Sequence, residues 1–234
     1  MIVCEKYKVI YSDIAKCASS SIKKYFETQK IDKLVLSFSK FEEYKNYFSF
    51  TFVRNPWERM VSIYTNKILS PHKFDPNTGV DICFARYGKV FNPDMTFNQF
   101  VKAVMDLDQT QLDSHIQPQY WRTCSQNTCD IILTFIGRLE NSVNDWYYIC
   151  RSSGMPFSAL LNVNKINRSH YSLYYNSESK DMVSKHWEKD INLFNYSNVY
   201  INSFRFYIIT NSKRRMGFII RSFTYHSICS VLWI

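Results

Sequence analysis

Two short segments of the sequence combine a basic side chain with hydroxyl groups at the start of a predicted helix. The first, residues 16–21, reads Lys-Cys-Ala-Ser-Ser-Ser and follows a predicted strand at residues 7–14. Small residues let backbone N–H groups approach an anion, and the helix dipole favours negative charge there. Lys16 adds a formal charge, and Ser20 and Ser21 add hydroxyl donors. The segment predicts an anion-binding loop, although a serine-rich helix cap with a solvated lysine has the same pattern.

The second segment begins at Arg54, where a continuous apolar run over residues 48–53 ends. A guanidinium at the end of a buried strand is costly unless an anion or a carboxylate meets it. Ser62 follows within a predicted helix, so a phosphate could accept two parallel hydrogen bonds from the guanidinium of Arg54 and a third from the hydroxyl of Ser62. The alternative is that Arg54 pairs with a carboxylate and that Ser62 is simply a small packed residue.

The elements that position these segments alternate between strand and helix, which indicates βαβ units and a parallel sheet covered on both faces. Strands are predicted at residues 7–14, 33–38, 48–53 and 131–136, and helices at 21–29, 56–68, 97–107, 142–153 and 177–189. The helix at Pro56 has Asn55 as its N-cap, with Glu58 placed to complete a capping box. Residues 70–94 are predicted to form a long loop. The fold class is therefore α/β.

Two of the helix predictions are supported by further patterns, an apolar face in one helix and a capping box before another. Four apolar residues of the Pro56 helix fall on one face: Trp57, Val61, Tyr64 and Ile68. Thr96 and Gln99 form a second capping-box pattern before an apolar run. Neither basic segment is a nucleoside-triphosphate P-loop, because GxxxxGK[ST] is absent and the first glycine of the chain is Gly79.

The composition is that of a globular domain with an anionic partner. The 234 residues are 46% hydrophobic and carry a formal net charge of +9, so nucleic acid, a membrane surface or a polyanionic small ligand all qualify. Near residue 195 the acidic residues end, and the basic residues beyond are Arg205, Lys213, Arg214, Arg215 and Arg221. We therefore predict a separate basic and apolar tail over residues 199–234, which suits contact with an anionic membrane face or with the core surface.

The seven cysteines are irregularly spaced and include no CxxC pair, so no zinc site is predicted. Cys124 and Cys129 could pair in an oxidising compartment, and free thiols in a reducing one are the alternative. The N-terminus lacks the layout of a signal peptide, and no apolar run of about 20 residues is present. The expected location is cytoplasmic.

Together, the two basic segments resemble the donor-binding elements of sulfotransferases that use 3′-phosphoadenosine 5′-phosphosulfate (PAPS), specifically the carbohydrate branch. That family's first element reads roughly Pro-Lys-x-Ala/Gly-x-Thr/Ser-Ser, and here Ala15 replaces the proline. Residues 52–64, FVRNPWERMVSIY, match the second element closely. Further blocks follow family order at residues 97–101, 115–119, 136–140, 145–146, 164–171 and 190–194. The resemblance covers roughly residues 5–196.

The resemblance implies a three-layer, P-loop-like sulfotransferase domain over residues 1–198. Its first element would cradle the 5′-phosphosulfate and its second the 3′-phosphate. It further implies in-line transfer of the sulfonate to a hydroxyl of a glycan or glycoconjugate, without a metal and without nucleic acid as a partner. The residues implied to contact the donor are Lys16, Cys17, Ala18, Ser19, Ser20, Ser21, Arg54, Ser62 and Arg168.

Catalysis of this kind needs a cation at the leaving group and a base at the acceptor. Lys16 is implied to stabilise the leaving nucleotide. His115 is the candidate base because histidine titrates near neutrality and lies here in a family-like block. A histidine bonded structurally to nearby backbone is the alternative for His115, and the other base candidates are His72, His170 and Glu140.

The chain departs from the family at its predicted end and around the base. Residues 194–198 read Phe-Asn-Tyr-Ser-Asn where the family has Phe-Gly-Tyr-x-Phe, and residues 35–50 contain no histidine. A truncated or non-catalytic family member that only binds the nucleotide is therefore the main alternative. A nucleotide kinase would need Walker glycines that are absent, and a nucleic-acid-binding protein would leave both motifs without a purpose.

Overall fold

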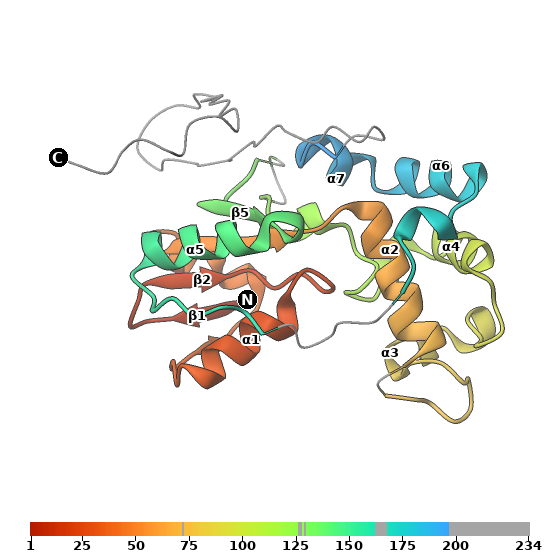
Figure 1. The fold of residues 1–234 in the computed structure, drawn as a ribbon, viewed down its shortest axis with the longest axis horizontal. Coiled ribbons are helices and arrows are strands. Elements are labelled where there is room, and N and C mark those ends of the chain that lie inside the picture. The colour runs from red at the N-terminus through yellow and green to blue at the C-terminus, as the bar shows by residue number, and fades with distance from the viewer. Residues whose placement is uncertain (72, 126–127, 129, 162–167, 197–234) are drawn as a thin grey trace.

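Five strands form one mixed sheet in the computed structural model, which describes residues 1–71, 73–125, 128, 130–161 and 168–196 (Figure 1). The strand order is β3-β1-β2-β4-β5, with the bounds β1 Ile2–Cys4, β2 Val9–Tyr11, β3 Leu34–Val35, β4 Phe48–Val53 and β5 Phe135–Arg138. Strands β2, β4 and β5 run parallel, whereas β1 runs antiparallel to β2 and β3. The α/β prediction is confirmed in this coarse form.

The prediction of an all-parallel sheet is wrong on the β1 side. Only four residues, 5–8, connect β1 to β2, and Lys8 takes a positive φ of 53° in that turn. A connection this short can join only antiparallel strands, because a parallel pair needs a crossover of a dozen or more residues. Strand β1 therefore forms a hairpin with β2, which the sequence pattern did not reveal.

Helices flank this sheet and form a second part of the molecule beside it (Figure 1). Their bounds are α1 Ser19–Thr28, α2 Pro56–Tyr64, α3 Ile82–Ala85, α4 Phe97–Met105, α5 Ser142–Ser153, α6 Ser177–His186 and α7 Glu188–Leu193. On the sheet, the Trp146 ring of α5 lies 4.7 Å from that of Tyr25 in α1 and 6.1 Å from that of Phe50 in β4. Helix α2 packs against α4 and α6, and so joins the two parts.

Several predicted elements are confirmed at their ends. Strand β4 spans residues 48–53, and α2 begins at Pro56 after Asn55, whose side chain accepts the N–H of Glu58 at 3.1 Å. Helix α4 follows a complete Thr96–Gln99 capping box. The predicted stripe of the Pro56 helix is buried at all four positions: Trp57, Val61, Tyr64 and Ile68.

Other predicted elements shift or divide. The strand expected at 33–38 is the two exposed residues of β3, and the one expected at 131–136 lies later, at β5. The helix expected over 177–189 divides at Trp187, whose buried ring lies against a guanidinium. The loop expected over 70–94 contains the short helix α3 and a 3₁₀ turn.

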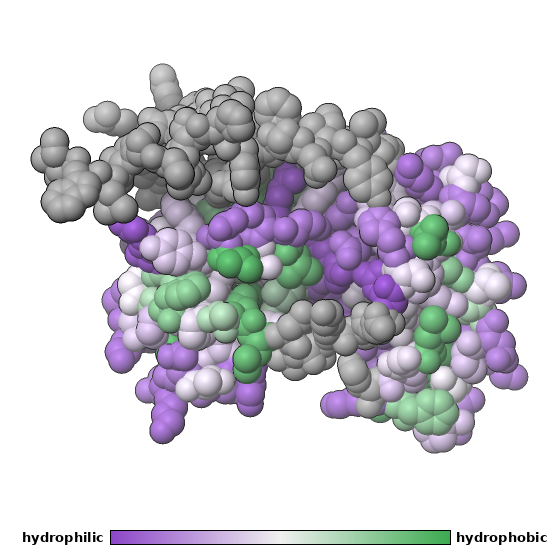
Figure 2. Space-filling model, viewed as in Figure 1, coloured by the Kyte–Doolittle hydropathy of each residue, from purple (hydrophilic) through white to green (hydrophobic). Residues whose placement is uncertain are grey.

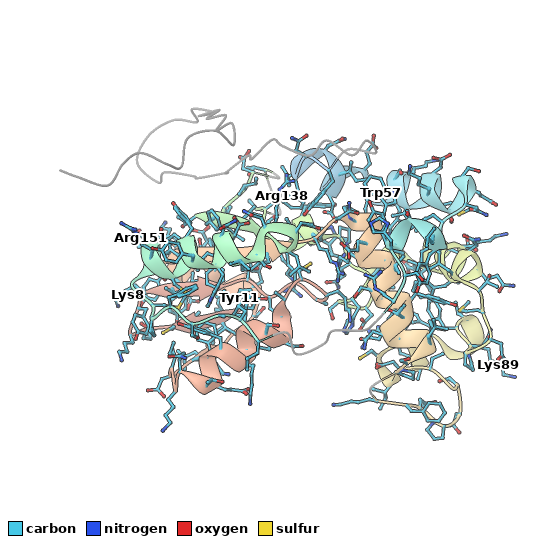
Figure 3. The ribbon with its side chains drawn as sticks, viewed as in Figure 1. Lys8, Tyr11, Trp57, Lys89, Arg138 and Arg151 are labelled. Carbon is cyan, nitrogen blue, oxygen red and sulfur yellow. The ribbon has the colours of Figure 1, made fainter. Side chains whose placement is uncertain are left out.

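The apolar core continues through both parts of the molecule. Tyr11 in the sheet and Trp57 at the start of α2 are both buried in it, whereas Lys8, Lys89 and Arg151 lie at the periphery (Figure 3). Among the described residues, no helix is long and apolar enough to cross a membrane. The predicted tail lies outside the described residues, as do His72 and the Cys129 half of the suggested disulfide.

Candidate functional site

The two basic segments meet at the carboxyl ends of neighbouring parallel strands. Strands β2 and β4 pair directly, with Tyr11 opposite Phe50, so the loops that follow them lie next to each other. This edge is where open α/β sheets bind ligands. A cavity of about 1130 Å³ opens there. Hydrophilic side chains gather between the sheet and the helical part (Figure 2).

Most of the predicted site residues line this one cavity. They are Lys16, Ala18, Ser19, Ser20, Ser21, Arg54, Ser62, His115 and Arg168. Cys17 is the exception: its buried thiol donates to Oε1 of Gln119 at 3.2 Å, and its N–H donates to the carbonyl of Ile14. Burial raises the pKa of Cys17 to about 12. Cys17 thus ties the first loop to the core rather than facing the cavity.

The first loop is held in a strained backbone shape. Lys16 and Ala18 have φ angles of 69° and 65°, in the left-handed region that non-glycine residues rarely occupy. Strain of this kind persists where the surrounding structure enforces it and is common at functional sites. Ala18 is the N-cap of α1 and has no side-chain acceptor, so the helix N-terminus faces the cavity without a side-chain cap.

The Lys16 ammonium is placed where its charge is costly. Burial, followed by the charges of Lys67 and Arg54, lowers the pKa of Lys16 to about 8. The charged form of a lysine in such a position is stabilised when an anion enters the cavity, because the anion's charge offsets both the cost of burial and the repulsion by the neighbouring cations.

One carboxylate gathers the two arginines of the cavity. Oε1 of Glu58 accepts from Nη2 of Arg54 at 3.1 Å and from Nη2 of Arg168 at 3.2 Å. The expected capping box is therefore wrong: Glu58 faces the arginines, and the N–H of Asn55 donates instead to Oε1 of Glu140 at 2.6 Å. The carboxylate pairing left open for Arg54 is observed.

Arg54 retains donor capacity despite this pairing. Its Nη1 donates to the carbonyl of Lys16 at 3.2 Å. Its Nε is buried without a hydrogen-bond partner among the described residues. A buried, unsatisfied donor of a guanidinium is rare and costly, and an anionic ligand is one way to satisfy it. The cavity therefore fits a ligand that carries more than one negative group.

A buried amide and carboxylate lock the two segments together, and sequence reasoning missed both. Gln119 accepts the N–H of Arg54 at Oε1 (2.8 Å) and donates from Nε2 to the Arg54 carbonyl (2.9 Å). Asp190 in turn accepts the backbone N–H groups of Gln119 and Tyr120, at 2.8 and 2.9 Å. Gln119 thus positions Arg54 and, through the thiol of Cys17, the loop that carries Lys16.

Arg59 is a second positioning residue that the sequence did not reveal. It is fully buried on α2 and donates to three carbonyls: Ala15 at 3.1 Å, His115 at 2.9 Å and Gln117 at 2.9 Å. Its guanidinium also lies 5.0 Å from the centre of the Trp187 ring. One side chain therefore fixes both the residue before Lys16 and the backbone of the His115 loop.

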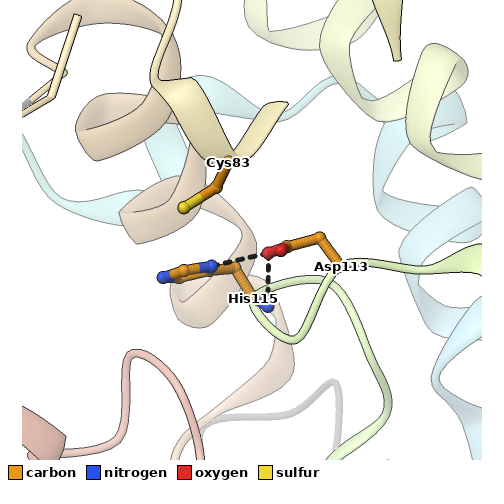
Figure 4. A group of neighbouring side chains, drawn as sticks. All are labelled: Cys83, Asp113 and His115. Carbon is orange, nitrogen blue, oxygen red and sulfur yellow. Dashed lines mark hydrogen bonds and ion pairs between the residues drawn. The ribbon is translucent and has the colours of Figure 1, made fainter. Parts of the chain in front are cut away.

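His115 forms a close pair with Asp113 (Figure 4). Its Nδ1 lies 2.6 Å from Oδ1 of Asp113, and its backbone N–H donates to the same oxygen at 2.9 Å. An ionised carboxylate only accepts, so Nδ1 carries the proton and Nε2 is the nitrogen that can take one up. Burial raises the pKa of Asp113, but these hydrogen bonds outweigh it and hold the pKa below its usual value.

Cys83 stands beside this pair, and the donor atoms of the three residues lie within 4.8 Å of one another (Figure 4). A metal at this point would need the thiolate of Cys83. Burial and the bond to Asp81 raise the pKa of this thiol, and Asp113 already accepts two hydrogen bonds. The geometry favours an Asp–His pair over a metal centre.

The other base candidates are placed less favourably. His170 lines the cavity but is exposed, and its Nδ1 lies 2.8 Å from the Ser172 hydroxyl. Glu140 does not line the cavity, and its two oxygens accept from the Asn55 N–H and the Tyr196 hydroxyl. Only His115 therefore combines a place in the cavity with an orienting carboxylate, among the candidates that the structure describes.

Comparison with known proteins agrees with this geometry. The model of the sulfotransferase family matches residues 1–197. The chain belongs to the sulfotransferase family. The resemblance predicted from the two motifs is thereby confirmed, and several relatives of this sulfotransferase lie in the carbohydrate branch.

Three relatives illustrate the extent of the similarity. Carbohydrate sulfotransferase 14 of Danio rerio is 31% identical over 118 residues, which are 48% of this chain and 31% of the relative. The Homo sapiens protein of that name is 27% identical over 176 residues, 62% of this chain and 46% of the relative. Carbohydrate sulfotransferase 10 of Gallus gallus is 24% identical over 239 residues, which cover 83% of this chain and 65% of the relative. The chain thus spans less than two thirds of each relative's length, and no solved structure matches it significantly.

Proposed function

We propose that this sulfotransferase transfers the sulfonate of PAPS to a hydroxyl group of a glycan or glycoconjugate. The observation that carries the proposal is the meeting of both basic segments and His115 in one cavity. A donor with a 5′-phosphosulfate and a 3′-phosphate needs two separate cationic positions, and Lys16 and Arg54 supply them from adjacent strand ends. The carbohydrate acceptor is inferred from the names of the relatives.

The donor-binding roles follow from what each side chain offers. The first turn of α1, with its serine hydroxyls, suits the 5′-phosphosulfate. Arg54, with its unsatisfied Nε, and Ser62 suit the 3′-phosphate. Arg168 lies beside Arg54 on the shared carboxylate of Glu58 and extends the cationic surface.

The catalytic roles divide between two ends of the reaction. Lys16 stabilises the charge that develops on the leaving nucleotide, where a buried ammonium acts most strongly. His115 takes the proton of the acceptor hydroxyl at Nε2, while Asp113 holds the ring and stabilises its charged form. Arg59 holds both loops, through the carbonyl of Ala15 next to Lys16 and through the carbonyl of His115, so the geometry exists before a ligand enters.

A non-catalytic member that binds only the nucleotide is the second candidate. The two are separated by titrating the full chain with the desulfated nucleotide and then measuring transfer of label from PAPS to a panel of glycans. We expect both binding and transfer, and binding without transfer to any glycan would favour the second candidate.

Lys16→Ala provides the sharper test of mechanism. The bridging oxygen of the leaving nucleotide gains negative charge between bound PAPS and the transition state, so turnover should be lost while affinity for PAPS weakens only moderately. A comparable loss in both quantities would contradict the role given to Lys16.

A further inference from the structure

Lys67 is a buried cation in the same cavity that the motifs did not single out. It lies in a π-helical turn, Thr65–Leu69, that directly continues α2. Lys67 is 6% exposed and lines the cavity together with Lys16 and His115. π-Helical turns are rare and are found disproportionately at functional sites, because they redirect side chains that a regular helix would place elsewhere.

The ammonium of Lys67 has one acidic partner. Its Nζ lies 3.2 Å from Oδ1 of Asp81, and the N–H of Asp81 returns to the Lys67 carbonyl at 2.9 Å. Asp81 is itself fixed, since the same carboxylate oxygen caps α3 through the N–H of Cys83. A lysine has three N–H donors, and no second partner of this ammonium lies among the described residues. The pair thus holds a cation in place and leaves donors available.

Stability alone does not explain this pair. Removing two charges from water costs several kcal/mol per ion, and a buried pair seldom recovers more than that cost. Replacing a buried ion pair with apolar residues of similar volume is often neutral or stabilising, so the charge of Lys67 calls for a reason beyond the fold. A buried lysine that faces a cavity rich in cations is instead suited to an anionic ligand.

The charge of Lys67 reaches both ends of the proposed reaction. On one side it contributes, after burial, to the lowered pKa of Lys16. On the other it contributes to the lowered pKa of Asp113, the partner of His115. In an in-line displacement the sulfur lies between the leaving oxygen and the attacking oxygen. Because Lys67 lines the cavity together with both Lys16 and His115, its ammonium is placed to reach the group in transfer.

We propose that Lys67 is a catalytic residue that donates a hydrogen bond to a non-bridging oxygen of the sulfonate in transfer, with Asp81 holding its ammonium in place. The inference rests on the proposed sulfotransferase activity. The acceptor oxygen forms its bond to sulfur as the bond to the bridging oxygen breaks. The acceptor proton goes to Nε2 of His115, and the bonding electrons leave with the nucleotide, next to Lys16. Lys67 itself gains and loses no proton in this step.

The test compares Lys67→Met with Lys102→Met, a matched loss of an exposed lysine on α4. Affinities for PAPS and for the desulfated nucleotide are measured by calorimetry without acceptor, and turnover is measured with label. Lys67→Met should lower the ratio of the affinity for PAPS to the affinity for the desulfated nucleotide about tenfold. It should also lower kcat on the order of 100-fold. Lys102→Met should change neither quantity.

Because Lys67→Met leaves Asp81 buried without its cation, the double variant Lys67→Met/Asp81→Asn is measured as well. It should show the same two losses with a wild-type thermal transition. An unchanged preference for PAPS, or equal weakening of both nucleotides, would overturn the contact between Lys67 and the sulfonate. The absence of transfer by the wild-type protein would instead contradict the proposed function, and the ratio of affinities would still decide the position of Lys67.

Discussion

Replacing Lys16 with methionine should stabilise the unliganded protein. The pKa of Lys16 falls from its ordinary 10.5 to about 8 in the folded chain, first through burial and then through neighbouring cations. Between these two pH values the unfolded chain binds more protons than the folded chain, so this group makes stability rise with pH across the window. Each pKa unit corresponds to about 1.4 kcal/mol, so the charged lysine costs about 3 kcal/mol at pH 7. Methionine keeps the length of the side chain and removes that cost.

Urea unfolding of the two proteins at two pH values measures the effect. The variant should be more stable by about 3 kcal/mol at pH 7, and the difference should shrink to about 1.4 kcal/mol at pH 9.5. Lys24→Met is the control, because Lys24 is an exposed lysine on α1, the helix that follows the Lys16 loop, so its loss should change stability by less than about 0.5 kcal/mol. A Lys16→Met protein that is no more stable than the wild type, or a difference independent of pH, would refute the reasoning.

Other substitutions test the remaining parts of the structure. Arg54→Ala should weaken the 3′-phosphorylated nucleotide roughly 10–100-fold more than its analogue without that phosphate, by calorimetry; equal effects would exclude Arg54 from phosphate recognition. Arg59→Met should lower the free energy of unfolding by about 3 kcal/mol or more, because three carbonyls lose their donor. Thr96→Ala removes the capping box and should cost about 1 kcal/mol in urea, with nucleotide affinity unchanged. A chain ending at Val199 should keep a cooperative thermal transition and bind the desulfated nucleotide, and loss of either would show that the tail belongs to the domain.

The sequence predicted those helices and strands whose ends are marked by residues at the ends themselves, such as caps and prolines. The end of strand β4 and the start of helix α2 are both marked by adjacent residues: an apolar run ends at Val53, and Arg54, Asn55 and Pro56 follow it. The capping box at Thr96 and Gln99 is an equally local signal for the start of α4. The hairpin of β1 was missed because three apolar residues carry no period, and only pairing with β2 makes them a strand.

The residues that brace the site could not be predicted in this way. Arg59, Gln119 and Asp190 act through contacts with segments 44 to 71 residues away in the chain, so their roles exist only once the chain has folded. Each has an ordinary local context: a polar position on a helix, a residue after a proline, and an acid in a charged run. The pairing of Asp113 with His115 spans two residues, but its meaning depends on the cavity that the ring faces.

The shared carboxylate of Glu58 has a consequence for product release. Arg54 and Arg168 face an internal counter-ion even when no ligand is present. In the proposed reaction, an incoming 3′-phosphate would have to compete with Glu58 for these guanidinium groups, which would weaken binding of every nucleotide that carries this phosphate. The desulfated nucleotide of the proposed reaction retains the 3′-phosphate, so a site without Glu58 would be prone to remain occupied by its own product. Under the proposed function, the carboxylate would help the protein to exchange spent donor for fresh donor, with some loss of affinity for both.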